Sequence, residues 1–149
     1  RFDFAGTDET GKEFVLEIKN VPLADYVDVE KKERKKYLDL IESKEFNDKI
    51  AYFPDGYRKK KNEVVSPRAL KHIQELEEIA LQGKMRAILC FIIQRKDVSL
   101  FQTSNLDPIY KEAVYKAYQN GVEINTLQVQ WTRNGECYFI RNDLPISLC

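Results

Sequence analysis

One uninterrupted apolar segment, Ala87–Ile93, constrains the fold of this chain more than any other feature. It is far shorter than the ~20 apolar residues that a membrane span needs, but it has the length of a strand. An all-apolar strand rich in β-branched and aromatic residues is typical of a strand covered on both faces. With 149 residues and 43% hydrophobic side chains, the chain suits one domain built around such a strand. No membrane partner is predicted.

A helix is expected on each side of this strand in the sequence. The first is predicted to begin at Ser66, an N-cap residue followed by proline, and to end at Gly83. Its apolar residues recur every three or four positions, as on the buried stripe of a helix. The second is predicted to begin at Asp107, which is also followed by proline, and to end at Gly121. A buried strand between two helices indicates an α/β fold.

The other elements are predicted from alternating apolar residues and from turn residues. They are strands at 1–4, 13–19, 50–53, 122–131 and 136–140 and a surface helix over 29–43. The first two strands are expected to pair as a hairpin around a turn at 7–12. The last two are expected to pair through Asn134-Gly135, a strong two-residue hairpin signal. Together these elements predict an α/β domain with a mixed β-sheet flanked by helices.

Composition excludes several classes of protein. The 24 basic and 24 acidic residues give a formal net charge of zero, which rules out a histone-like protein and an acidic disordered tail. Cys90, Cys137 and Cys149 are odd in number and form no C-x-x-C pair, so neither a disulfide framework nor a zinc site is expected. These features favour a reducing, intracellular compartment. Because the chain begins at Arg1 rather than at methionine, we expect an upstream segment in the whole protein.

The sharpest candidate site is a pair of acids and a lysine in the predicted N-terminal hairpin. Glu17 and Lys19 are two residues apart on a strand, so their side chains share a face, while Ile18 points oppositely, into the core. Pairing of the two strands would bring Asp3 beside Glu17. Neighbouring carboxylates repel each other, and a divalent cation relieves this repulsion. The two carboxylates, the backbone carbonyl of Ile18 and water would suffice to hold Mg²⁺ or Mn²⁺.

Such a site has the parts that phosphodiester hydrolysis needs. A bound divalent metal lowers the pKa of a coordinated water and polarises a phosphoryl oxygen. Lys19 would orient the attacking water or neutralise the charge that builds up on the phosphate. The same spacing also arises on a solvent-facing hairpin with a cross-strand ion pair, which contributes roughly 0.2–1 kcal/mol. The spacing alone leaves both interpretations open.

Two further groups are candidates for nucleic-acid contacts or for positions next to the site. Arg68, Lys71 and His72 fall within about one helical turn and would clamp phosphates, although a solvated helix face is the alternative. Gln94 and Arg95 follow the buried strand at the carboxyl end, where α/β folds place their sites. There Gln94 would touch the metal-bound water or a phosphate, or both residues would simply end the strand.

Two basic runs lie between the first hairpin and the first long helix. Residues 31–36 mix lysines and arginine with an acid, whereas the second run contains no acid and consists of Arg58, Lys59, Lys60 and Lys61. Such runs give salt-dependent, sequence-neutral affinity for nucleic acid. A charge run is also typical of a solvated surface, so both interpretations stand.

Eight short segments occur in an order that is informative as a set. They are Arg1-Phe-Asp-Phe4, Val15-Leu-Glu-Ile-Lys-Asn-Val21, Ala51-Tyr-Phe-Pro-Asp55, Ser66-Pro-Arg-Ala-Leu-Lys-His-Ile73, Phe91-Ile-Ile-Gln-Arg95, Leu106-Asp-Pro-Ile-Tyr110, Gly121-Val-Glu-Ile124 and Leu144-Pro145. In this order they resemble the C-terminal region of the bacterial sugar fermentation stimulation protein A family, over nearly the whole chain. Residues 28–48 and 56–65 are longer than the family's usual pattern, and each carries a basic run and a tyrosine.

The resemblance implies a single restriction-endonuclease-like domain of the PD-(D/E)XK type over residues 1–149. The family's N-terminal OB-fold-like domain, which would bind nucleic acid, lies outside this sequence. By position, Asp3 and Glu17 match the motif's two acids and Lys19 matches its lysine. The implied function is nucleic-acid binding, with DNA favoured over RNA, and divalent-metal-dependent DNA cleavage. The alternative is a non-catalytic DNA-binding or regulatory module that retains the nuclease fold.

Overall fold

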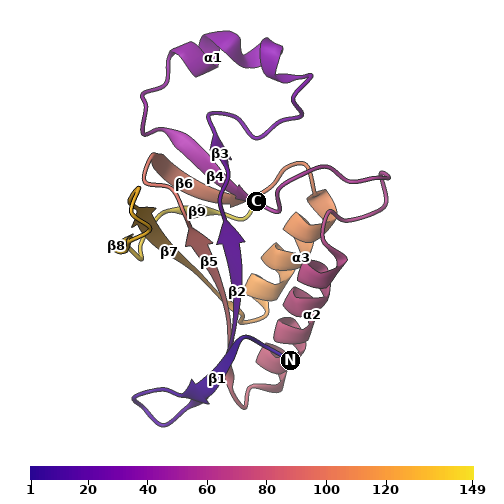
Figure 1. The fold of residues 1–149 in the computed structure, drawn as a ribbon. Coiled ribbons are helices and arrows are strands. Elements are labelled where there is room, and N and C mark those ends of the chain that lie inside the picture. The colour runs from indigo at the N-terminus through magenta and orange to yellow at the C-terminus, as the bar shows by residue number, and fades with distance from the viewer.

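The computed structural model describes all of residues 1–149, which form two β-sheets and two long helices (Figure 1). The larger sheet has the order β1-β2-β5-β7-β8 and contains β1 (Phe4–Thr7), β2 (Glu13–Val21), β5 (Arg86–Ile93), β7 (Glu123–Trp131) and β8 (Cys137–Arg141). The smaller sheet has the order β3-β4-β6-β9 and contains β3 (Ala24–Asp25), β4 (Lys49–Phe53), β6 (Val98–Thr103) and β9 (Ile146–Ser147). The helices are the 3-10 helix η1 (Arg34–Tyr37), α1 (Leu38–Glu42), α2 (Pro67–Gln82) and α3 (Pro108–Gln119).

Both sheets are mixed, and the long helices lie on one face of the larger sheet. Strands β2, β5 and β7 are parallel, with β1 and β8 antiparallel at the two edges. The connections from β2 to β5 and from β5 to β7 carry α2 and α3 and advance in the same direction across the sheet. Crossovers of one hand that advance in one direction place their helices on the same face, as Figure 1 shows. The predicted α/β class, with a mixed sheet flanked by helices, is confirmed.

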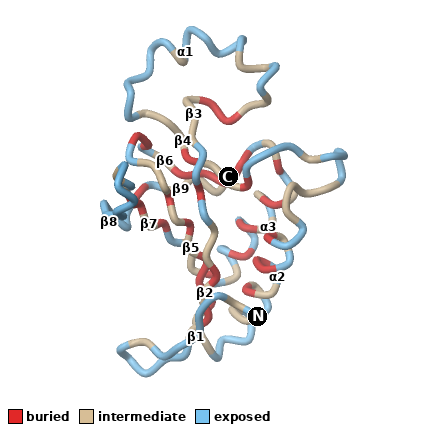
Figure 2. The backbone as a smooth tube through the Cα atoms, viewed as in Figure 1, coloured by how far each residue is buried: buried red, intermediate tan, exposed pale blue.

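The central strand β5 forms the middle of the core, as its composition predicts. Leu89, Phe91 and Ile93 are fully buried on the face toward the helices. On the opposite face Cys90 and Ile92 are only partly buried, so complete coverage of both faces is not observed. Figure 2 shows buried segments on the larger sheet, on α2 and α3 and on the smaller sheet, whereas β1, β8 and the segment around α1 are largely exposed.

The capping residues fix both long helices where the sequence predicts them. The Ser66 hydroxyl accepts a hydrogen bond from the Ala69 amide at 3.2 Å, and Gly83 ends α2 with a positive φ of 70°. The Asp107 carboxylate accepts from the Tyr110 amide at 3.1 Å and so begins α3. Neither these helices nor α1 is long and apolar enough to span a bilayer.

Three predictions of secondary structure are wrong in detail. The first strand begins at Phe4 rather than at residue 1, and it runs on through the start of the predicted turn. The helix over 29–43 is reduced to η1 and the five-residue α1, because no residue of either is buried and a short helix without packing is marginal. Strands β3, β6 and β9 were not predicted. Strands β3 and β9 have only two residues each, and β6 carries the polar residues Gln102 and Thr103 at buried positions.

Candidate active site

Strand β2 places its charged residues on the face that the helices cover. Val15, Glu17 and Val21 are buried on that face, and Lys19 lies between the last two. In the parallel register Glu17 is opposite Leu89 and Lys19 is opposite Phe91, so both lie over the core side of β5. The prediction that Ile18 points into the core is wrong, since Ile18 lies on the other face and outside the buried core cluster.

Glu17, Lys19 and His72 form a buried polar cluster between β2 and α2. The Glu17 residue is 2% exposed, and its Oε1 atom accepts from Lys19 Nζ at 2.5 Å. The same oxygen contacts Nδ1 of His72, which lies 3.0 Å from Lys19 Nζ. A buried carboxylate is costly without a charged partner, and the Lys19 ammonium supplies that partner here.

His72 is separated from the two basic residues with which the sequence groups it. It is buried, whereas Arg68 and Lys71 are exposed, with Lys71 3.7 Å from the Glu75 carboxylate. The solvated helix face therefore describes Arg68 and Lys71 but not His72. His72 lies next to the predicted site and contacts Glu17 and Lys19.

Asp3 lies at the edge of β2, just before β1 begins. The antiparallel register pairs Phe4 with Leu16, which places Asp3 opposite Glu17. The Asp3 carboxylate accepts from the Ile18 amide at 2.8 Å. In an extended strand the N–H and C=O of one residue point to the same edge, so the Ile18 carbonyl is directed toward the same side as Asp3.

Three buried side-chain oxygens of the chain have no hydrogen-bond partner. They are Oε2 of Glu17, the hydroxyl of Thr103 and the hydroxyl of Tyr110. Burial raises the pKa of Tyr110, and the carboxylates of Asp107 and Glu17 raise that pKa further. Tyr110 is therefore a core residue, as predicted. Its place in the first turn after the Asp107 cap is the sequence signal that could have identified it.

The donor set fits a hard divalent cation that keeps much of its water. No group of three or more His, Cys, Asp or Glu side chains is arranged to hold a metal. The available donors are the Asp3 and Glu17 carboxylates and the Ile18 carbonyl, all of them oxygens. Mg²⁺ is typically bound by one or two carboxylates with water in its remaining positions. The unpartnered Oε2 of Glu17 is the atom that such a cation would satisfy.

Gln94 and Arg95 are not next to this cluster. Gln94 donates from Nε2 to Asn20 at 3.0 Å, and Asn20 points to the face of β2 opposite Glu17. Trp131 Nε1 donates to the other end of the same amide, Gln94 Oε1, at 2.7 Å. Arg95 donates twice to Asp97, at 2.8 and 2.6 Å. The predicted contact between Gln94 and a water on the metal is therefore not supported by this arrangement.

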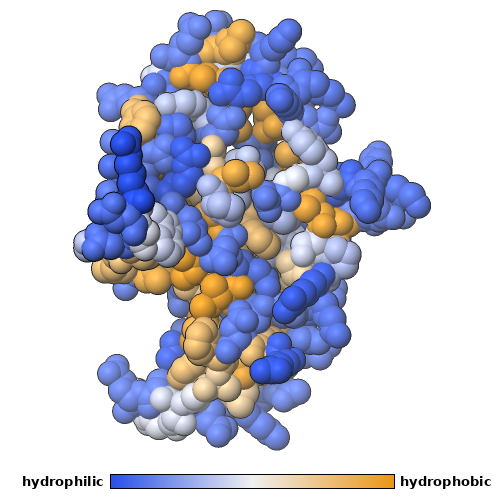
Figure 3. Space-filling model, viewed as in Figure 1, coloured by the Kyte–Doolittle hydropathy of each residue, from blue (hydrophilic) through white to orange (hydrophobic).

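The two basic runs differ in how their charges are used. In the first run Lys32 and Lys36 pair with Glu30 and Glu33, and Arg34 pairs with Asp25. The second run lies in the loop between β4 and α2, which projects from the molecule as a hydrophilic protrusion (Figure 3). With Tyr57, its four basic residues line a surface pocket of about 260 Å³. Of the four, only Lys60 makes an ion pair, with Glu63 at 3.7 Å, and Glu30 also lines the pocket, so positive charge remains in excess in the second run.

Comparison with known proteins agrees with the resemblance read from the sequence. The family model described as the sugar fermentation stimulation protein RE domain matches residues 1–135. Over 87 residues the chain is 41% identical to a sugar fermentation stimulation protein homolog of Geobacter sp. (strain M21) and 38% identical to one of Lawsonia intracellularis. These matches cover 58% of this chain and 34% and 30% of the relatives, so the aligned part is about a third of their length.

A solved structure has the same fold. It is described as the structure of Pyrococcus furiosus SfsA in complex with Ca²⁺, and it matches with a TM-score of 0.70 and 26% sequence identity. The match covers 99% of this chain and 50% of that chain. The fold described above is therefore the fold of about half of the longer protein.

Proposed function

Since this chain belongs to the sugar fermentation stimulation protein family, we propose that it is a PD-(D/E)XK nuclease-like domain that hydrolyses phosphodiester bonds in nucleic acid with Mg²⁺ or Mn²⁺. In this proposal Asp3 and Glu17 are the two acids of the motif and Lys19 is its lysine. DNA is the favoured substrate. The proposal concerns the domain, because the chain spans only part of its relatives.

The observation that carries the proposal is the state of Glu17. Its side chain is almost completely removed from solvent, one oxygen is held by Lys19 and His72, and the other has no partner. An unsatisfied oxygen on a buried carboxylate costs on the order of 1–3 kcal/mol or more. That oxygen is free to bind a metal ion, which would satisfy it.

Asp3 and the Ile18 carbonyl would complete the metal site. Both are directed to the same edge of β2, and Asp3 lies opposite Glu17 in the register. The Ca²⁺ in the Pyrococcus furiosus relative supports an oxygen-rich site, since Ca²⁺ and Mg²⁺ both prefer oxygen ligands. The metal would supply a water of lowered pKa and would polarise the phosphoryl oxygen.

Lys19 and His72 would prepare the site around the reacting phosphate. Lys19 pairs with Glu17 and carries the positive charge that would neutralise charge building on the phosphate. His72 would act as a positioning residue, because its Nδ1 lies against both Glu17 and Lys19 and restricts their rotamers. The basic run of residues 58–61 would add sequence-neutral affinity for the phosphate backbone.

A non-catalytic nucleic-acid-binding domain is the second candidate function. Two observations favour it: Asp3 already accepts from the Ile18 amide, and no cluster of three metal-ligating side chains is present. In that case the buried cluster would stabilise the fold, and only the positive surface would contact nucleic acid.

Cleavage of single- and double-stranded DNA with Mg²⁺, Mn²⁺ or a chelator tests the proposal. We expect metal-dependent cleavage that falls by about 100-fold in Glu17→Gln, because the variant keeps the size of the side chain but loses its charge. The matched control is Glu112→Gln, on the exposed side of α3. DNA binding without cleavage across both metals would overturn the hydrolase and leave the non-catalytic domain.

A further inference from the structure

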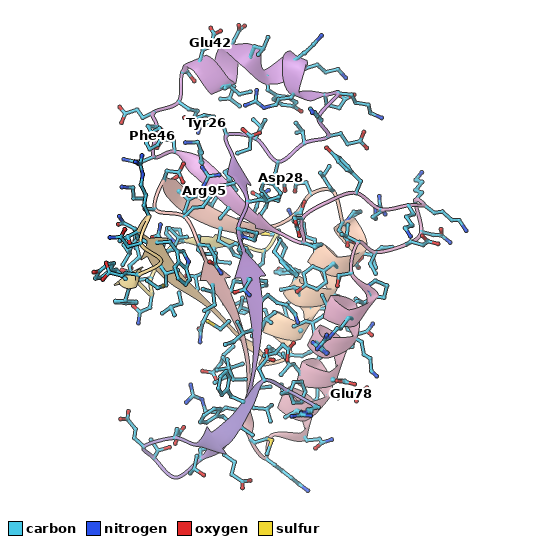
Figure 4. All side chains as sticks on the ribbon, viewed as in Figure 1. Tyr26, Asp28, Glu42, Phe46, Glu78 and Arg95 are labelled. Carbon is cyan, nitrogen blue, oxygen red and sulfur yellow. The ribbon has the colours of Figure 1, made fainter.

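A second pocket lies on the opposite face of the larger sheet, at the carboxyl ends of β5 and β7. Its volume is about 300 Å³. Its walls include two aromatic rings, two amides and two cations: Phe46, Trp131, Gln94, Gln130, Arg95 and Lys96. Figure 4 shows Phe46 and Arg95 on the same side of the molecule, with Tyr26 beside them. This pocket is separate from the Glu17 site, although Asn20, which holds Gln94, directly follows Lys19 on β2.

Both aromatic rings of this pocket are exposed and yet held in place. Phe46 is 66% exposed and Trp131 is 52% exposed. The Trp131 indole donates to Gln94, which in turn donates to Asn20. The Lys49 ammonium lies 3.9 Å from the centroid of the Phe46 ring and donates to the Phe46 carbonyl at 2.9 Å. Rings oriented before a ligand arrives lose little conformational entropy when it binds.

The polar groups around the rings suit an anionic ligand with hydrogen-bonding edges. Lys49 and Arg95 share the single acid Asp97, and Lys96 makes no ion pair, so positive charge is in excess here. The Gln130 side chain makes no hydrogen bond within the protein and lines the pocket with its donor and acceptor free. Positive charge beside exposed aromatic rings is the combination by which proteins bind single-stranded nucleic acid.

We propose that the pocket between Phe46 and Trp131 binds an unpaired nucleobase of a single-stranded nucleic acid, an inference that rests on the proposed function for its class of ligand. The base stacks on the exposed aromatic surface, Gln130 hydrogen-bonds its edge, and Lys96 contacts a neighbouring phosphate. Phe46 reaches the pocket from the segment between α1 and β4. The substrate class is therefore DNA or RNA with at least one unpaired base.

Fluorescence of Trp131 tests this directly, because it is the chain's single tryptophan. A short oligodeoxythymidylate is titrated into the protein with a chelator present, so that no cleavage occurs. We expect saturable quenching as a base stacks on the indole. An abasic oligonucleotide of the same length carries the same phosphates and should quench little. Equal quenching by both oligonucleotides would overturn the proposal and assign the binding to the phosphates alone.

A leucine at position 46 distinguishes stacking from a general apolar contact. Phe46→Leu keeps an apolar side chain but removes the flat ring, so binding of the oligodeoxythymidylate should weaken about 5- to 150-fold. The matched control Tyr118→Leu removes an equally exposed aromatic ring from α3 and should bind as wild type does. Wild-type affinity in Phe46→Leu would show that no base stacks on the Phe46 ring and would overturn the proposal.

The outcome is independent of the hydrolase proposal. Quenching without metal-dependent cleavage would leave the base pocket in place and overturn only the hydrolase. Cleavage without quenching would support the hydrolase and overturn only the base pocket.

Discussion

The charged residues of two regions differ in how completely they are paired. The regions are the helix-covered face of the larger sheet and the carboxyl end of β5. On the helix-covered face, Glu17 is buried and one of its oxygens has no partner. At the carboxyl end of β5, Arg95 and Lys49 both donate to the buried Asp97, so both of its carboxylate oxygens have partners. An incompletely satisfied buried group is costly and calls for an explanation, whereas a buried carboxylate with two cationic partners does not. The difference locates the candidate chemistry on the helix-covered face.

The largest expected effect comes from removing the lysine of the buried face. Lys19→Met should leave Glu17 buried without its charged partner and should lower metal-dependent cleavage by about 100-fold or more. It should also lower the free energy of unfolding by about 3–5 kcal/mol, since a buried charge loses its partner. Cleavage rates and urea unfolding measure the two effects. Lys84→Met, at an exposed lysine without an ion pair, is the control.

The double variant Glu17→Gln/Lys19→Met separates these two effects. Neutralising both partners should recover much of the lost stability without recovering cleavage. A stability that falls further in the double variant would contradict the coupling between Glu17 and Lys19.

A smaller effect is expected at the Tyr110 hydroxyl, another buried oxygen without a hydrogen-bond partner. Tyr110→Phe removes a buried hydroxyl that has no hydrogen bond, so the free energy of unfolding should stay level or rise by about 1 kcal/mol. Urea unfolding measures it, with Tyr115→Phe as the control at a more exposed position on α3. A loss of more than about 1 kcal/mol would mean that the hydroxyl is bonded in solution.

The smallest expected effect is a pH-dependent change in the free energy of unfolding, caused by Asp97 near the end of β5. The hydrogen bonds from Arg95 and Lys49 lower the pKa of Asp97 to about 2, although its burial acts in the opposite direction. Because the folded pKa lies below the unfolded one, this stabilisation is present above about pH 4 and is lost as the pH falls toward 2. Asp97→Asn should therefore cost about 1 kcal/mol at pH 7 and little near pH 2, once solvent screening is counted. Urea unfolding at several pH values tests this, and an equal cost at pH 7 and pH 2 would contradict it.

Local signals in the sequence predicted the parts of the fold that depend on local physics. Ser66 and Asp107 cap their helices as expected, and the apolar segment Ala87–Ile93 forms most of the central strand β5. The partly polar β6 was missed, because its Gln102 and Thr103 are buried by partners that are distant in sequence. The spacing of Glu17 and Lys19 predicted a shared face, but not that the helices cover it.

The candidate site shows the same limit. Its acids and lysine could be named from the sequence, while the contact between β2 and His72 depends on how α2 packs across the sheet. Gln94 was expected near the metal because it ends the central strand. Side chains alternate between the two faces of a strand, so Asn20, to which Gln94 donates, lies on the face opposite Glu17. There Gln94 accepts a hydrogen bond from Trp131.

A crystal of this chain soaked in Mn²⁺, with the ion located by its anomalous scattering, tests the central claim most directly. The account predicts one ion coordinated by the Asp3 and Glu17 carboxylates and by the Ile18 carbonyl, with water in its other positions. The ion should be absent from crystals of Glu17→Gln. An ion bound elsewhere, or an Oε2 of Glu17 that hydrogen-bonds to an ordered water with no metal nearby, would contradict it.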